Sequence, residues 1–363
     1  AICMSHPFGT HLPRWVFIQL LESCNLRCKM CYEWGESGSY FGKKHLKELD
    51  VQPVLRVIEE CKEMRPHYDL YGGEPLLYRN LGQVIAAIKA SGGTVDIPTN
   101  GTLLERESET LVESGLDRVW VSLDGPQKVN DFQRGAGVYE KAMHGIDHLF
   151  HVRAEMGKSR PKIGIGTVIT PDNYRYISQL VLKELDLDKI EHISLELQAF
   201  ITEEEYERYI QFLDKEFQIK SAPIAHGVVC NLKHFETIDA HDLACQIAAI
   251  QDECDRRGIY LNTNPKDMSE KNIAAYFAGQ WDCTSHKKSR CPFPWLSMEV
   301  SASGDVCTCH SFYDLTLGNI YESSVRDIWN GPAYKHFREQ ARKGLLPICP
   351  SCCLYHVQKP GTV

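Results

Sequence analysis

The sequence lacks several features that mark whole classes of protein. It has no run of roughly 18 or more apolar residues, so no membrane span is expected. Its longest basic cluster, Lys287-Lys288-Ser289-Arg290, is short, and the formal net charge is −8, so no nucleic-acid partner is predicted. The N-terminus lacks both the basic stretch and the long apolar stretch of a secretory signal, and a cytoplasmic location is therefore expected.

The sequence has fifteen cysteines, which is too low a share for a disulfide scaffold in a chain of 363 residues, but they are clustered. Three fall between positions 24 and 31, and eight fall between 254 and 353. Clustered cysteines in a chain without a secretion signal indicate metal binding. Cys61, Cys245 and Cys254 lie singly within helix-like patterns and are expected to be small packed side chains.

The hydrophobic pattern predicts alternating strands and helices in the first 200 residues. Strands are expected near 15–21, 68–71, 94–98, 119–123, 163–169 and 190–197, and helices near 51–64, 81–91, 106–114, 139–156 and 174–185. Alternation of this kind predicts parallel βα units, and six units predict an α/β fold with a partial (β/α)6 TIM-like barrel. The next stretch, 201–280, is expected to be mostly helical. We place a domain boundary after residue 282, between a core domain (1–282) and a small cysteine-rich domain (283–363).

The first cysteine cluster, Cys24-x3-Cys28-x2-Cys31, comes directly after the first expected strand. It therefore lies at the carboxyl end of that strand, where βα barrels gather their active sites. Structural zinc sites usually take four protein ligands, and only three cysteines are close here. Three thiolates on a 4Fe–4S cluster leave one iron without a protein ligand. Because that iron can bind a substrate or cofactor directly, the spacing indicates a catalytic iron–sulfur site.

The segment Cys24-x3-Cys28-x2-Cys31-Tyr32 resembles the signature of the radical S-adenosylmethionine (SAM) superfamily. The resemblance implies that the three cysteines hold a 4Fe–4S cluster and that SAM binds the open iron through its amine and carboxylate. It also implies that an electron from the cluster cleaves SAM to a 5′-deoxyadenosyl radical. Tyr32 is then expected to lie near the adenine.

Further segments resemble the same family in the expected order. Gly72-Gly73-Glu74-Pro75 is similar to its Gly-Gly-Glu-Pro motif, in which glycines let backbone approach a ligand and a carboxylate or carbonyl can accept from the SAM ammonium. For three residues that the resemblance places at SAM, another role stays open: Asn100 as a turn residue, Asp124 as the cap of a turn and Arg134 as the anchor of a loop. The resemblance implies that the residues contacting SAM or facing its cavity are Tyr32, Gly72, Gly73, Glu74, Pro75, Asn100, Ser122, Asp124, Arg134 and Gln198.

The C-terminal cysteines belong to a second pattern, which resembles the SPASM extension of radical SAM enzymes. Its pieces are Cys291-Pro292, the run from Gly304 to Cys309, Gly318-Asn319-Ile320, Ile328-Trp329 and the run from Cys349 to Cys353. The resemblance implies one auxiliary 4Fe–4S cluster, bound by Cys291, Cys309, Cys349 and Cys352.

Several alternatives remain for these cysteines. A zinc ribbon uses the same number of sulfurs. Cys353 could replace Cys352, and Cys307 could replace Cys309. Cys283 is a further candidate ligand. Cys230 and Cys283 are alternatively hydrogen-atom donors or inert buried thiols.

These resemblances imply an oxidoreductase in which the radical abstracts hydrogen from the substrate and the auxiliary cluster accepts the second electron. Peptide-modifying relatives often carry an N-terminal recognition domain, and the first expected strand begins near Arg14, which leaves no room for one. A small molecule, such as a natural product or cofactor precursor, is therefore favoured over a ribosomally made peptide. A flavodoxin or ferredoxin is the expected electron donor. A non-enzymatic zinc-binding scaffold is the third interpretation.

Overall fold

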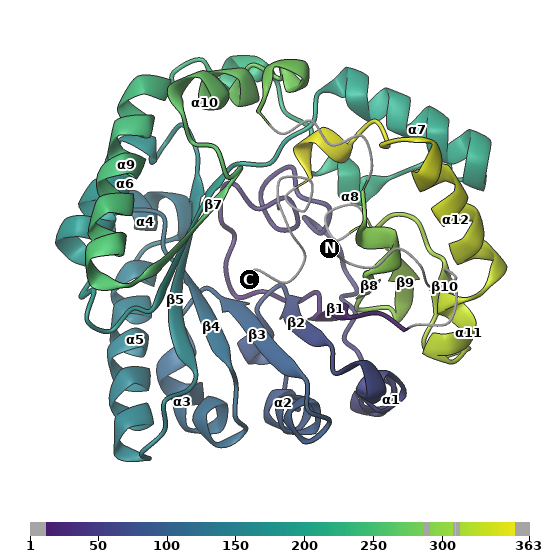
Figure 1. Cartoon of the computed structure of the whole chain (residues 1–363), viewed down its shortest axis with the longest axis horizontal. Coiled ribbons are helices and arrows are strands. Elements are labelled where there is room, and N and C mark those ends of the chain that lie inside the picture. The colour runs from purple at the N-terminus through teal and green to yellow at the C-terminus, as the bar shows by residue number, and fades with distance from the viewer. Residues whose placement is uncertain (1–11, 286–290, 308, 310–312, 353–363) are drawn as a thin grey trace.

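The computed structural model describes residues 12–285, 291–307, 309 and 313–352. Its framework is one ten-stranded sheet in the order β10-β9-β8-β1-β2-β3-β4-β5-β6-β7. Figure 1 shows these strands curving around a common centre, with helices on the outside. The strands are β1 (Trp15–Leu21), β2 (His67–Gly72), β3 (Thr94–Thr99), β4 (Arg118–Ser122), β5 (Lys162–Ile169), β6 (His192–Leu197), β7 (Tyr260–Asn264), β8 (Ser297–Val300), β9 (Asp305–Cys307) and β10 (Gly318–Asn319).

Helices follow the strands of the barrel wall, so the α/β class and the barrel-like architecture predicted from the sequence are confirmed. Neighbouring strands from β8 through β1 to β7 all pair in parallel. The helices are α1 (Val51–Cys61), α2 (Leu81–Ala90), α3 (Leu104–Glu113), α4 (Gln127–Arg134), α5 (Val138–Glu155), α6 (Ile177–Gln179), α7 (Glu203–Phe217), α8 (Pro223–His226), α9 (Ala240–Arg257), α10 (Glu270–Phe277), α11 (Val325–Trp329) and α12 (Pro332–Lys343).

The strands present different side chains to their two faces. In β4, Val119 and Val121 are fully buried, whereas Trp120 and Ser122 on the opposite face are partly exposed. Because side chains alternate along a strand, the buried pair faces the outer helices and the partly exposed pair faces the barrel centre. Polar side chains on the inner face can therefore meet a ligand.

Two elements of the barrel differ from the sequence expectation. The stretch 174–185 is not one regular helix, because α6 is flanked by a 3-10 turn (Tyr174–Tyr176) and a π-helical turn (Leu180–Glu184). The strand β7 lies in a region expected to be helical, and it extends the six expected strands along β6. Its sequence, Tyr-Leu-Asn-Thr-Asn, is partly exposed throughout, so it lacks the apolar pattern by which the other strands were found.

The C-terminal segment joins the same sheet. Strand β8 pairs with β1 from Trp15↔Ser297 to Ile18↔Val300, and β9 and β10 continue antiparallel beside it. The domain boundary after residue 282 stays a prediction, and hydrogen bonds between strands link the segments on its two sides. No helix in the described ranges is both long and apolar enough to cross a membrane.

Candidate active site

The loop after β1 carries the first three cysteines, as the sequence predicted. Cys24 and Cys31 pack, together with Tyr32, against a small buried cluster that includes Trp34. The backbone N–H of Trp34 donates to the Cys31 sulfur at 3.3 Å, and that of Leu26 donates to the Cys24 sulfur at 3.4 Å. The loop therefore fixes two of the thiols by its own backbone.

The three thiols influence one another electrostatically. Burial raises the pKa of Cys24 to about 12, and the charges of Glu74, Cys28 and Cys31 add to the rise. Burial likewise raises the pKa of Cys31 to about 11, with Glu33 and Cys28 adding to it. Thiolates gathered here need positive charge to persist, and bound iron supplies it. The donor set thus fits an iron–sulfur cluster held by three cysteines.

Arg134 lies beside the third thiol of this group. Burial raises the pKa of Cys28, and the Arg134 guanidinium opposes that rise. The Nε of Arg134 also donates to Asp124 Oδ2 at 2.6 Å, and both side chains are almost completely buried. Asp124 Oδ1 accepts from the backbone N–H of Val168 at 3.1 Å. Both carboxylate oxygens of Asp124 therefore have protein donors, while its predicted contact with ribose stays untested.

The glycines of the segment Gly72 to Pro75 are required by a close approach of two backbone segments. A Cβ on Gly72 would lie 2.3 Å from the Leu21 carbonyl oxygen, and one on Gly73 would lie 2.3 Å from that of Ser23. Gly73 N–H donates to the Leu21 carbonyl at 3.0 Å. These contacts press the segment against the end of β1 and the start of the cysteine loop. These backbone contacts by themselves account for the two glycines, whereas the sequence analysis attributed them to the close approach of a ligand.

The carboxylate of Glu74 is engaged by the protein. It accepts from the N–H of Leu76 at 3.0 Å, from the Thr99 hydroxyl at 2.8 Å and from the N–H of Asn100 at 2.8 Å. Burial raises the pKa of Glu74, and these three donors oppose the rise. Asn100 in turn donates from Nδ2 to Asn25 in the cysteine loop at 2.8 Å. Glu74 and Asn100 thus connect the ends of β2 and β3 to the cysteines, and a SAM contact would fall to other groups of this segment.

Two predicted residues have capacity for a ligand. Ser122 ends β4 on the inner face. Gln198 follows β6, and its buried Oε1 has no hydrogen-bond partner among the described residues. A buried acceptor without a donor is unusual in a folded protein, so a ligand donor is a reasonable partner for it. The roles of both residues stay predictions.

The C-terminal cysteines also come together. Burial raises the pKa of Cys349 above its usual range, and the charges of Cys309 and Cys291 add to the rise. Cys291 and Cys352 both pack against the aromatic cluster of Phe17, Tyr71 and Phe293. The ligand assignment stays a prediction, because these contacts place the four cysteines in one region without showing a ligand set.

The alternatives among these cysteines differ in their surroundings. Cys307 is fully buried and packs instead with Trp34, Tyr40 and Tyr313. Cys353 lies outside the described residues. Cys230 is half-buried, and the exposed Cys283 ends a 3-10 turn. The structure therefore gives Cys283 no buried environment, contrary to its expected role as an inert buried thiol.

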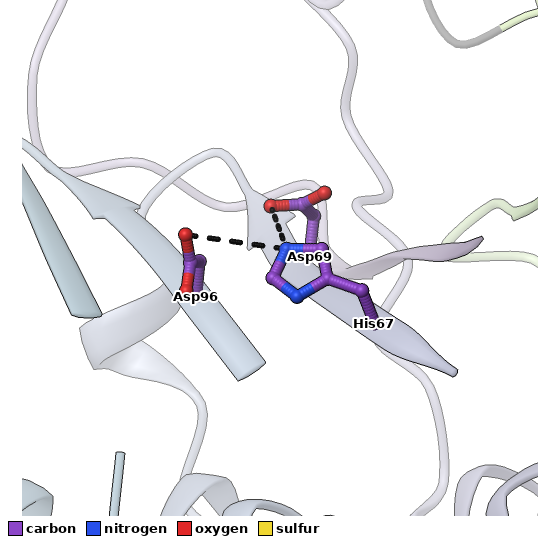
Figure 2. A group of neighbouring side chains, drawn as sticks. All are labelled: His67, Asp69 and Asp96. Carbon is purple, nitrogen blue, oxygen red and sulfur yellow. Dashed lines mark ion pairs between the residues drawn. The ribbon is translucent and has the colours of Figure 1, made fainter. Parts of the chain in front are cut away.

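The sequence analysis missed a polar group on the inner faces of β2 and β3 (Figure 2). His67 Nε2 lies 3.6 Å from Asp69 Oδ1 and 4.0 Å from Asp96 Oδ2, and His67 Nδ1 meets the Thr94 hydroxyl at 2.8 Å. Among the described residues, these three side chains are the only group of three possible ligands whose atoms lie within 4.8 Å of one another. Arg118 Nε lies 3.5 Å from Asp96, so cationic side chains already face these carboxylates. Charged residues at alternating positions of a strand were the available signal.

Comparison with protein-family models gives two matches. The radical SAM superfamily model matches residues 18–155, and a SPASM model, an iron–sulfur cluster-binding domain, matches residues 291–353. The first range contains the cysteine loop and the ends of β2 to β4, and the second contains all four predicted auxiliary ligands. The two matches fall on the two cysteine groups that the structure gathers.

Relatives with curated names cover different parts of the chain. A tungsten-containing aldehyde ferredoxin oxidoreductase cofactor-modifying protein of Pyrococcus furiosus is 22% identical over an alignment 365 positions long, which covers 94% of this chain and 87% of the relative. An Fe-coproporphyrin III synthase of Methanosarcina barkeri is 25% identical and covers 69% of this chain and 59% of the relative. A probable GTP 3′,8-cyclase of Methanocella arvoryzae is 35% identical, over only 36% of this chain and 41% of the relative.

Solved structures share the fold. Streptococcus suis SuiB bound to SAM superposes with a TM-score of 0.63 at 19% identity, covering 95% of this chain and 72% of that protein. The enzyme anSMEcpe with bound SAM gives a TM-score of 0.59 at 16% identity, covering 91% and 80% respectively. These similarities support the fold assignment.

Proposed function

We propose that this chain, which belongs to the radical SAM superfamily and carries its SPASM extension, oxidises or dehydrogenates a small-molecule substrate. It is an enzyme that uses 4Fe–4S clusters and SAM. The observation that carries the proposal is the gathering of three partly buried thiols at the barrel mouth. The charges of Cys28 and Cys31 raise the pKa of Cys24, and that of Cys28 raises the pKa of Cys31, so the group is suited to a polynuclear cation rather than to isolated thiols.

In this proposal Cys24, Cys28 and Cys31 hold the catalytic cluster. When bound, the cluster and SAM supply a 5′-deoxyadenosyl radical that abstracts a hydrogen atom. Arg134 contributes positive charge beside Cys28 and is held in place by Asp124. The barrel wall excludes water and holds one C–H bond of the substrate in reach.

The SAM contacts are proposed from the inner face of the barrel. Tyr32 is suited to pack against adenine, since it lies next to Cys31. Ser122 is suited to a ribose hydroxyl, and the partnerless Oε1 of Gln198 is suited to accept a hydrogen bond. Gly72, Gly73, Glu74 and Asn100 are proposed to shape this site through their contacts with the end of β1 and the cysteine loop, Asp124 by holding Arg134, and Pro75 as part of the same segment as Glu74.

For the auxiliary site we propose that Cys291, Cys309, Cys349 and Cys352 bind one 4Fe–4S cluster. Four protein ligands leave no iron open, so such a cluster cannot easily bind substrate. When bound, such a cluster would supply an acceptor for the second electron. A flavodoxin or ferredoxin is the proposed donor for the catalytic cluster, and a reducing, cytoplasmic setting would keep these thiols available.

Two kinds of substrate compete. The names of the sequence relatives refer to cofactor modification and to haem or coproporphyrin synthesis, which favours a small molecule. One structure of SuiB contains its precursor peptide, which keeps peptide modification as the second candidate. A non-enzymatic zinc scaffold is not supported, since the matched families are enzymes that contain iron–sulfur clusters.

The test is anaerobic reconstitution with iron and sulfide, followed by reduction and addition of SAM. Wild-type protein should release 5′-deoxyadenosine, and replacing Cys24, Cys28 and Cys31 by alanine should abolish the release. Cys245→Ala is the matched control, because that cysteine is exposed on α9, contrary to the packed side chain expected from the sequence. A substrate should raise the yield of 5′-deoxyadenosine above the uncoupled level, so panels of small molecules and peptides can be compared. Zinc in place of iron would refute the proposal.

A further inference from the structure

A buried polar network lies between the two groups of cysteines. Gln19 Nε2 lies 2.9 Å from Glu33 Oε1 and from the Tyr40 hydroxyl and 3.0 Å from the Tyr313 hydroxyl, so its two N–H groups are shared among three acceptors. The Tyr313 hydroxyl donates to Glu33 Oε1 at 2.6 Å. Gln19 Oε1 accepts from the N–H of Ala302 at 3.1 Å. We call Gln19, Glu33, Tyr40 and Tyr313 the bridging network.

The network joins three parts of the chain that are far apart in sequence. Gln19 lies on β1, Glu33 and Tyr40 lie in the loop that follows Cys31, and Tyr313 belongs to the C-terminal segment. All four side chains are buried, and Gln19 and Glu33 are only 0% and 5% exposed. Hydrogen bonds between such buried groups fix the relative position of the segments, because breaking one would leave a polar group without water or a partner.

The position of the network along β1 gives it a specific use. Side chains alternate, so Phe17 and Gln19 face the same side of β1. Phe17 packs in the cluster that contacts Cys291 and Cys352, and β1 runs on past Gln19 to the loop with Cys24. The bridging network therefore lies between the auxiliary cysteines and the catalytic cysteines.

The same network fixes the loop that contains Cys31 and Tyr32. Within that loop the Tyr40 N–H donates to the Glu33 carbonyl at 2.7 Å, and the N–H of Ser39 donates to the Tyr32 carbonyl at 2.9 Å. The loop is therefore folded back on itself, with Glu33 and Tyr40 as its two attachments to the network. A displacement of either attachment would move Tyr32 and Cys31 together.

We propose that Tyr313 is a positioning residue: by donating to Glu33 it lets the C-terminal segment hold the loop 32–40 in the shape that binds SAM. The proposal rests on the proposed function for the identity of the ligand. It gives the C-terminal segment a second task besides carrying cysteines, since it also completes the wall of the SAM site.

The experiment compares Tyr313→Phe with wild-type protein after anaerobic reconstitution. Tyr313→Phe removes one hydroxyl and leaves the ring, so iron and sulfide contents should not change. The loss of a buried hydrogen bond predicts roughly tenfold weaker SAM binding, measured by titration of the cluster's absorption or resonance spectrum. Amide hydrogen exchange in 32–40 should be faster in the variant even without SAM. Tyr174→Phe is the control, because that buried hydroxyl makes one bond, to the Thr237 carbonyl at 2.7 Å.

Each outcome decides the proposal. Unchanged exchange in 32–40 overturns it, and so does faster exchange with unchanged SAM affinity. If Tyr313→Phe does not fold, Glu33→Gln weakens the same hydrogen bond from its acceptor side and is read in the same way. A wild-type protein that binds no SAM refutes the proposed function, and the exchange rates of the loop then decide alone whether Tyr313 holds it.

Discussion

The substitution Gly73→Ala tests whether the glycine serves the backbone or the ligand. An added Cβ would lie 2.3 Å from the Ser23 carbonyl oxygen and 2.5 Å from that of Glu22. A comfortable separation of carbon and oxygen is about 3.3 Å, so the start of the cysteine loop must move by about 1 Å. Overpacking of this kind costs about 1–3 kcal/mol of folding free energy.

The assay is urea unfolding of the cluster-free protein, followed by tryptophan fluorescence, with the free energy of unfolding taken by linear extrapolation. Gly166→Ala is the matched control on the same sheet, because a Cβ there meets no atom within 4 Å. It should be neutral or should stabilise the protein by about 0.4–1 kcal/mol, since alanine restricts the unfolded chain.

Gly73→Ala should also take up less iron at the first site, because the displaced backbone carries Cys24. The reasoning is refuted if the variant is as stable as wild type and takes up iron normally but binds SAM poorly. That pattern would show that the glycine makes room for SAM instead of for the loop.

Three further predictions follow from the described contacts. Arg134→Met should lower the free energy of unfolding by about 3–5 kcal/mol, because Asp124 is left buried without its cation. In urea unfolding, the double variant with Asp124→Asn should recover much of this loss, and full stability of Arg134→Met alone would contradict the prediction. Burial, aided by Arg118, lowers the pKa of His192 to about 4, so the folded protein favours the neutral imidazole and its stability should fall as the pH drops from about 6.5 towards 4. The urea midpoint of His192→Gln should decline less over this pH range, and an equal decline would assign the loss of stability to other groups. Replacing Cys349 and Cys352 by alanine should lower the iron content, measured by metal analysis, from about eight to about four atoms per chain. The variant should still form 5′-deoxyadenosine but no oxidised product, and an unchanged iron content would refute the assignment of the auxiliary ligands.

Much of the barrel could be predicted because its strands are apolar and its helices are periodic. The expected strand at 15–21 coincides with β1, and the helix expected near 81–91 matches α2. Strand β7 could not be found in the same way, since its hydrogen bonds to β6 stabilise it despite its polar sequence. The pairing of β8 with β1 joins residues 282 positions apart, such as Trp15 and Ser297, and local pattern carries no information about such a contact.

The candidate site shows the same division between local and distant information. The spacing of Cys24, Cys28 and Cys31 is local, so the sequence was sufficient to predict that they act together. The partners of Glu74 and Asp124 come from β3, α4 and β5, and they could not be read from the motifs. A motif names the residues of a site, but burial and distant donors decide whether a carboxylate faces a ligand or braces the fold.

The pairing of β8 with β1 has a practical consequence for experiments on the C-terminal segment. A strand at the margin of a sheet presents backbone N–H and C=O groups that can pair with another molecule. β8 covers that margin of β1 from Trp15 to Ile18. Truncating the protein before β8 would therefore expose unpaired backbone groups at the edge of β1, next to the catalytic cysteines, and the truncated protein would tend to aggregate. Loss of activity in such a truncated protein would then result from self-association as much as from the loss of a cofactor. Single substitutions avoid this problem, because β8 stays paired with β1.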